Sequence, residues 1–152
     1  MLREFVESKH CKFADSAPTW QEAIRMSCQP LEADGTVEEN YKEDIIECIN
    51  KYGPYIVIMP GVAMPHSQEC AKGVHNTAIS FMKLKNAVSF VEGDPEMDAK
   101  LFFTLASCNP EQHLENMTKL SELLMNEAAV EALKEAETTE DLMNIQEKYL
   151  DE

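Results

Sequence analysis

Hydrophobic positions recur at helical spacing in the first third of the chain. One face of a predicted helix carries apolar side chains at Trp20, Ile24, Cys28 and Leu31. A Thr19–Glu22 capping box starts this helix, and Pro30 is expected to end it. A second capping box, Thr36–Glu39, predicts another helix that stops at Gly53, which Pro54 follows.

The middle of the chain changes to short apolar runs of strand length. These runs are Tyr55–Met59, Thr77–Leu84, Ala87–Val91 and Lys100–Ala106. The first and last are nearly continuous, which is typical of a sheet covered on both faces. The segment His10–Ala14 is a further candidate, as an edge strand.

Helical spacing returns in the last third of the chain. Asn109 is placed to cap a helix that runs to Met125, with Pro110 in its first turn. Two more helices are predicted, at about Glu127–Ala136 and Thr139–Leu150. The alternation predicts an α/β fold, in which helices pack on a sheet, within one domain that spans residues 1–152.

Charge narrows the classes of partner. The 152 residues include 13 basic and 28 acidic side chains, which give a net charge of −15. Such a surface repels nucleic acid and anionic lipid and attracts basic protein surfaces. The chain lacks an apolar run long enough to cross a membrane, and its N-terminus lacks a signal peptide. We therefore expect a cytoplasmic protein with no direct membrane insertion.

The five cysteines do not suggest a disulfide framework, because their number is odd and no Cys-x-x-Cys pair occurs. A metal site is one open alternative, with His66, Cys70 and His75 as ligands. The spacing of these residues is loose for such a site, so no metal and no cofactor are expected.

His66 is the most distinctive histidine, because it follows a proline at the end of an apolar stretch. Pro65 has a fixed φ and restricts Met64 to extended geometry, so the backbone that enters His66 is stiff. His113 lies in the first turn of the helix that begins after Asn109, where a neutral imidazole and free backbone N–H groups would suit a phosphate. Ordinary structural histidines are the alternative at both positions.

Longer stretches around these histidines resemble a known family. The sequences PGVAMPH, TAISFMKLKNAVSF and DPEMDAKLFFTLASCNPEQHLENMTKLSELL are similar to the type 2 IIA domains of the bacterial phosphotransferase system, the mannitol–fructose class. TWQEAIR, GTVEENY and KYGPYIVIMPGVAMPH are most similar to the ascorbate-type, single-domain members. The resemblance runs from about Trp20 to the C-terminus. It implies an α/β sandwich with a mixed β-sheet flanked by helices.

The resemblance also implies a reaction. His66 would accept a phosphoryl group from phospho-HPr and pass it to a cysteine of a IIB protein, which is coupled to a membrane IIC permease. His113 matches the second histidine of the family's site and would stabilise the phosphoryl group. No metal or cofactor takes part.

Two departures from the family keep a second function open. Ser67 and Gln68 follow His66 where many relatives have Ala-Arg or Gly, and the arginine that mannitol-type members place upstream is missing. Lys51 is the only basic residue in that stretch. A regulatory module, which binds a partner according to its phosphorylation state, is therefore the alternative to a phosphocarrier.

The stretch from Tyr52 to Gln68 contains no charged side chain, although the whole chain is acidic. An uncharged surface can be desolvated at low cost when a partner docks. We therefore expect the partner proteins to dock on Met64, Pro65, Ser67 and Gln68, beside the reactive histidine.

Overall fold

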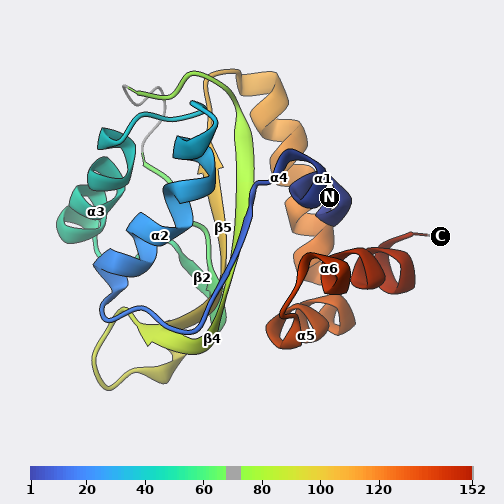
Figure 1. The fold of residues 1–152 in the computed structure, drawn as a ribbon. Helices are drawn as coiled ribbons and strands as arrows, with labels where there is room; N and C mark the ends of the chain where they lie inside the picture. The colour runs from blue at the N-terminus through green and yellow to red at the C-terminus, as the bar shows by residue number, and fades with distance from the viewer. Residues whose placement is uncertain (68–72, 152) are drawn as a thin grey trace.

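A computed structural model describes residues 1–67 and 73–151. Within these residues, helices cover both faces of one mixed β-sheet (Figure 1), so the predicted α/β sandwich is confirmed. The helices are α1 (Leu2–Ser8), α2 (Trp20–Ala33), α3 (Asn40–Tyr52), α4 (Pro110–Met125), α5 (Glu127–Glu135) and α6 (Thr139–Ile145). A 3₁₀ turn at Pro95–Met97 and a π-helical turn at Gln146–Leu150 complete the helical segments.

The sheet places the strands in the order β1-β4-β5-β3-β2. The strands are β1 (Cys11–Ala14), β2 (Val57–Met59), β3 (Gly61–Ala63), β4 (Ala78–Ser89) and β5 (Asp98–Ala106). β4 and β5 pair antiparallel along most of their length, whereas β1 joins β4 and β3 joins β5 in parallel. Pro60 alone connects the antiparallel strands β2 and β3, and the positive φ of Gly61 (89°) allows this tight turn.

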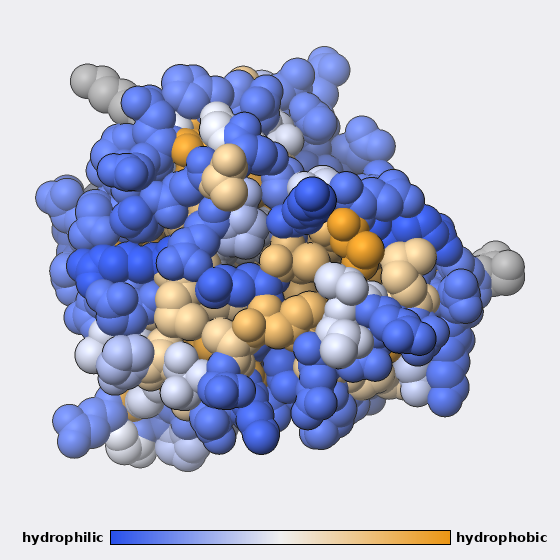
Figure 2. Space-filling model, viewed as in Figure 1, coloured by the Kyte–Doolittle hydropathy of each residue, from blue (hydrophilic) through white to orange (hydrophobic). Residues whose placement is uncertain are grey.

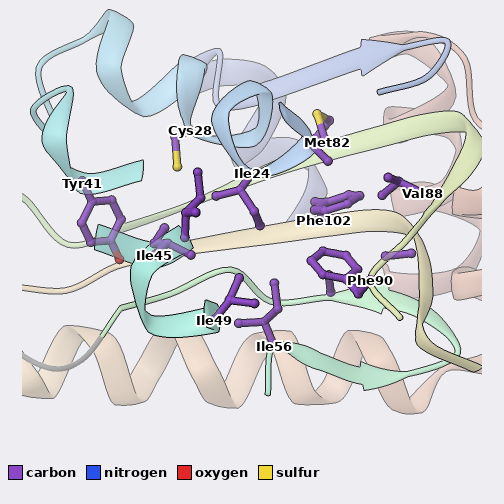
Figure 3. Packing of buried hydrophobic residues seen from close by; sticks show 14 of the residues in the cluster. Ile24, Cys28, Tyr41, Ile45, Ile49, Ile56, Met82, Val88, Phe90 and Phe102 are labelled. Atoms are coloured by element: carbon purple, nitrogen blue, oxygen red, sulfur yellow. The ribbon is translucent and has the colours of Figure 1, made fainter. Parts of the chain in front are cut away.

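Two apolar clusters hold the helices to the sheet. Between the sheet and helices α2 and α3, the cluster includes Ile24, Ile45, Met82 and Phe102 (Figure 3). On the other face, α1, α4, α5 and α6 bury a cluster that includes Phe81 and Phe103 from the sheet. Each fully buried large side chain of this kind contributes about 1.5–3 kcal/mol. Hydrophilic residues cover most of the surface seen in Figure 2, in keeping with the net charge of −15.

Several helix and strand predictions are confirmed. Thr19 caps α2 by accepting the N–H of Glu22, and Asn109 caps α4 by accepting that of Gln112. Gly53 terminates α3, and β1 is an edge strand as expected. Within the described residues, no helix combines the length and the apolar character that crossing a membrane would require.

Two helix predictions are wrong. Pro30 does not end α2, which continues to Ala33 with Leu31 fully buried against the sheet; this burial offsets the backbone hydrogen bond that proline cannot donate. Thr36 does not cap α3. Its hydroxyl and its N–H both donate to the carboxylate of Asp34, and the helix begins instead at Asn40.

Three strand predictions also need correction. The runs Thr77–Leu84 and Ala87–Val91 form a single strand, β4. Tyr55–Met59 is not a strand covered on both faces: only Val57–Met59 is extended, and it lies at the sheet edge with Ile58 and Met59 exposed. β3 could not be predicted from the sequence, because three residues after a proline are too short for a periodic pattern.

Candidate functional site

His66 lies just past the carboxyl end of β3, where the backbone continues to pair with its neighbours. The N–H of Met64 donates to the carbonyl of Ile56 (2.8 Å), and the N–H of Leu105 donates to the carbonyl of Pro65 (2.9 Å). These bonds fix the two residues before His66 to β5 and to the segment that precedes β2. The backbone before His66, which Pro65 was predicted to stiffen, is thus hydrogen-bonded to a neighbouring segment on each side.

The imidazole of His66 has a defined orientation. Its Nδ1 atom lies 2.6 Å from the carbonyl oxygen of Met64. A carbonyl oxygen can only accept a hydrogen bond, so Nδ1 carries the proton and the lone pair of the neutral ring is on Nε2. The half-buried ring also meets Tyr55 edge-on, with the ring centroids 5.1 Å apart and an interplanar angle of 85°. The ring can therefore present Nε2 as a nucleophile.

Two tyrosine hydroxyls contact the backbone at His66 and the residue after it. Tyr55 donates its hydroxyl proton to the carbonyl of His66. Tyr41 donates to the carbonyl of Leu105, and its oxygen lies 3.5 Å from the N–H of Ser67. Figure 3 shows Tyr41 reaching from α3 toward the sheet. Neither role was predicted from the sequence; the available signal was that a tyrosine in an apolar stretch needs a partner for its hydroxyl.

Both tyrosines are protonated at neutral pH. Burial raises the pKa of Tyr41 well above its usual value, because an ionised phenol would lose its hydration. Burial and the neighbouring Cys48 thiol raise the pKa of Tyr55 to about 12. Each hydroxyl can therefore donate to the carbonyl beside it.

His113 occupies the first turn of α4, and Thr77, just before β4, holds the backbone where this helix starts. β5 ends at Ala106, and the Thr77 hydroxyl accepts the N–H groups of Cys108 and Asn109, both at 2.9 Å. The backbone N–H of His113 then donates to the carbonyl of Asn109 (2.9 Å). His113 and His66 thus both belong to segments attached at the carboxyl end of β5. Among the described residues, no hydrogen bond joins the two side chains.

The expected docking residues differ in accessibility. Met64 and Pro65 are buried, so they offer little surface to a partner. Ser67 is half-buried and lies at the surface beside His66. Gln68 lies outside the described residues.

Among the described residues, neither arginine binds at this site. The two arginines of the sequence pair elsewhere: Arg3 binds Asp151 (2.6 Å), and Arg25 binds Glu22 and Glu43. The ammonium of Lys51 lies 5.2 Å from the ring centroid of Tyr52. The missing arginine noted in the sequence is therefore not replaced by either arginine from another part of the fold.

The alternative of a metal site gains no support from the described part of the chain. There, no group of three His, Cys, Asp or Glu side chains lies close enough to hold a metal ion. The exposed His75 instead pairs with Glu38 (3.1 Å), and Cys70 is not among the described residues.

Comparisons with known proteins agree with this arrangement. A family model described as phosphoenolpyruvate-dependent sugar phosphotransferase system, EIIA 2, matches residues 4–149. The ascorbate-specific PTS system EIIA component of Escherichia coli K12 is 29% identical over 140 residues, which cover 91% of this chain and 90% of that protein.

Two solved structures share the fold over nearly the whole chain. The mannitol-specific cryptic phosphotransferase enzyme IIA CmtB from Escherichia coli has a TM-score of 0.81 and 34% identity, covering 95% of this chain and 96% of that chain. The complex of enzyme IIA and phosphorylated enzyme IIB for mannitol, also from Escherichia coli, contains a chain with a TM-score of 0.76 and 24% identity, covering 90% of this chain and 93% of that one.

Proposed function

Because the chain belongs to the EIIA 2 family of the phosphoenolpyruvate-dependent sugar phosphotransferase system (PTS), we propose that it carries a phosphoryl group on Nε2 of His66. The donor is phospho-HPr, and the acceptor is a cysteine of a IIB protein or domain coupled to a membrane IIC permease. The observation that carries the proposal is the bond between Nδ1 and the Met64 carbonyl, which leaves Nε2 unprotonated.

In the first half-reaction, the Nε2 lone pair attacks the phosphorus atom and the bond from phosphorus to the donor's nitrogen breaks. Nδ1 keeps its proton, and the Met64 carbonyl stabilises the positive charge that the ring gains. In the second half-reaction, the thiolate of the IIB cysteine attacks phosphorus and the bond to Nε2 breaks. His66 returns to its neutral form with its proton still on Nδ1.

His113 is proposed to stabilise the phosphoryl group rather than to carry it. Its place in the first turn of α4 puts it near the backbone N–H groups that form the positive end of the helix dipole. A positioned donor of this kind lowers the energy of the transferring group without forming a covalent bond.

The proposed substrate system is an ascorbate-type permease or a related one, by similarity to the ascorbate-specific relative named above. The proposed location is the cytoplasm, where thiols such as the free Cys11, Cys28, Cys48 and Cys108 stay reduced. Partner proteins are proposed to approach over Ser67, with the buried Met64 and Pro65 as a rigid base.

The test is phosphorylation with phosphoenolpyruvate, enzyme I and HPr, followed by intact mass. The wild-type protein should gain one phosphoryl group that is labile in acid and stable in base. His66→Ala should gain none, His75→Ala should behave as wild type, and His113→Ala should be labelled but transfer onward more slowly. Full labelling of His66→Ala, or equal failure of the His66 and His113 variants, would contradict these roles.

A regulatory module of the same fold is the second candidate, and the lack of arginine favours it. Both arginines are paired with carboxylates at other places on the surface, so a phosphoryl group at His66 would lack a bidentate partner from either of them. Onward transfer to a IIB cysteine distinguishes the two: a carrier transfers its label, whereas a regulator retains it and binds a partner. A neighbouring gene for a permease and a small IIB protein would also favour the carrier.

A further inference from the structure

The peptide group that joins His66 to Ser67 has a tyrosine hydroxyl at each of its two polar ends. Tyr55 donates to the His66 carbonyl, and the Ser67 N–H donates to the Tyr41 oxygen over 3.5 Å. The carbonyl and N–H of a trans peptide point in opposite directions, so the two hydroxyls hold this group from opposite sides. Tyr41 is itself fixed, because it is 2% exposed and its hydroxyl donates to the Leu105 carbonyl.

We propose that Tyr55 and Tyr41 form a clamp on this peptide group and act as positioning residues for phosphoryl transfer at His66. This inference rests on the proposed function, because it assigns the two tyrosines a part in the same reaction. Among the described residues, neither hydroxyl bonds to Nε2, and both contact the backbone at His66 and Ser67.

The clamp completes a set of restraints on both sides of the histidine. Before His66, the backbone is held by the bonds of Met64 to Ile56 and of Leu105 to Pro65. After His66, the clamp holds the next peptide plane, so both the φ and the ψ of His66 are fixed. The remaining freedom is that of the side chain, which the Nδ1 bond to Met64 and the edge-on ring of Tyr55 restrict.

This arrangement matters because the restraints on the ring depend on one another. The Nδ1 bond returns to a carbonyl only two residues earlier, so it forms only while the His66 backbone keeps its present conformation. If the peptide after His66 could rotate, its carbonyl would leave the Tyr55 hydroxyl, and the Tyr55 ring would no longer be held edge-on against the imidazole. The His66 side chain could then turn away from the Met64 carbonyl, and the two neutral tautomers would mix. Nε2 would then spend less time unprotonated and aimed at the partner, and transfer would slow.

The clamp has a second consequence for the phosphoryl group. The Ser67 N–H points to Tyr41, so it is already used and does not face a phosphoryl group on Nε2. Donors for the phosphoryl oxygens would therefore come from other groups, and the start of α4 with His113, which follows the carboxyl end of β5, is the candidate proposed above.

The sharpest test compares Tyr55→Phe with Tyr52→Phe. Phenylalanine at position 55 keeps the edge-on ring and removes only the hydroxyl, and Tyr55 is 37% exposed, so the fold should be retained. Tyr52 is three residues earlier and 54% exposed, and its hydroxyl makes no hydrogen bond among the described residues, which makes it a matched control. Two quantities are measured: the rate of phosphorylation by phospho-HPr, and the ¹⁵N chemical shifts of the His66 imidazole.

We expect Tyr55→Phe to lower the rate about threefold to tenfold, as loss of one orienting hydrogen bond would. Its His66 ¹⁵N shifts should move toward the average of the two tautomers, while Tyr52→Phe matches wild type in both measurements. Tyr41→Phe should shift the His66 signals in the same direction, with some loss of stability from the unpaired Leu105 carbonyl.

The inference is overturned if Tyr55→Phe leaves either the rate or the ¹⁵N shifts equal to those of Tyr52→Phe. A lower rate with unchanged shifts would mean that the hydroxyl contacts the partner instead of orienting His66. A wild-type protein that accepts no phosphoryl group would refute the proposed function and, with it, a role in transfer. The imidazole spectra would then still decide whether the tyrosines orient the ring.

Discussion

Replacing Thr77 by valine should detach the start of α4 from the sheet without changing the shape of the side chain. The Thr77 hydroxyl accepts the N–H groups of Cys108 and Asn109, both at 2.9 Å, and the residue is 9% exposed. A hydrogen bond of this kind contributes about 1 kcal/mol, and a partly buried N–H left without an acceptor adds to the loss. The two bonds together predict a loss of about 2–3 kcal/mol in the free energy of unfolding.

Thermal unfolding measures this loss directly. For a chain of this size, about 2–3 kcal/mol corresponds to a decrease in Tm of roughly 4–12 °C. Thr77→Ser is the matched control, because it keeps the hydroxyl and loses one methyl group, at a cost of about 1 kcal/mol. If Thr77→Val were no less stable than Thr77→Ser, the hydroxyl could not be what fixes the β5–α4 junction.

Two other substitutions test the surface near His66 and the pH dependence of folding. Ser67→Asp should lower phosphate acceptance at least about tenfold with unchanged Tm, because it puts a negative charge beside an incoming dianion, and Ser67→Asn should not; rates within twofold of wild type for Ser67→Asp would show that partners dock elsewhere. The pKa of Asp141 is lowered mainly by the backbone N–H of Glu137 and further by Thr138 at the start of α6, so its stabilising effect is present above the ordinary value of 3.8 and is lost as the pH falls through the lower folded value. Chemical denaturation across this range should show a smaller acid-induced loss for Asp141→Asn, and an identical loss would contradict this assignment.

Local signals predicted the parts of the fold that depend on neighbouring residues. Thr19 and Asn109 cap their helices because each side-chain oxygen accepts a free N–H only three residues later. Such a cap depends on no distant part of the chain. Gly53 ends α3 for a similarly local reason, since its positive φ of 86° suits glycine. The failures at Pro30 and at Tyr55–Met59 have a different origin. Burial of Leu31 overrides a local break in α2, and the exposed position of β2 follows from strand order, which no run of apolar residues encodes.

In the candidate site, too, features set by adjacent residues could be predicted, whereas contacts between distant residues could not. His66 could be proposed from the sequence because Pro65 and the residues that carry the family resemblance lie beside it. The contacts that orient it were not, because Tyr41 and Leu105 meet only after α3 has packed against the sheet. A tyrosine in a helical stripe looks like an ordinary core residue until the partner of its hydroxyl is known.

The order of the strands has a consequence for how the chain folds during synthesis. β4 and β5 are consecutive and antiparallel, so this hairpin can form as soon as both strands have left the ribosome. The strands β1, β2 and β3 emerge earlier, yet β1 needs β4 as its partner and β3 needs β5. His66 is therefore translated well before Leu105, whose N–H anchors the residue preceding it. The sheet-facing apolar surface of the N-terminal half therefore stays uncovered until the β4–β5 hairpin forms, and the backbone around His66 reaches its final geometry only then.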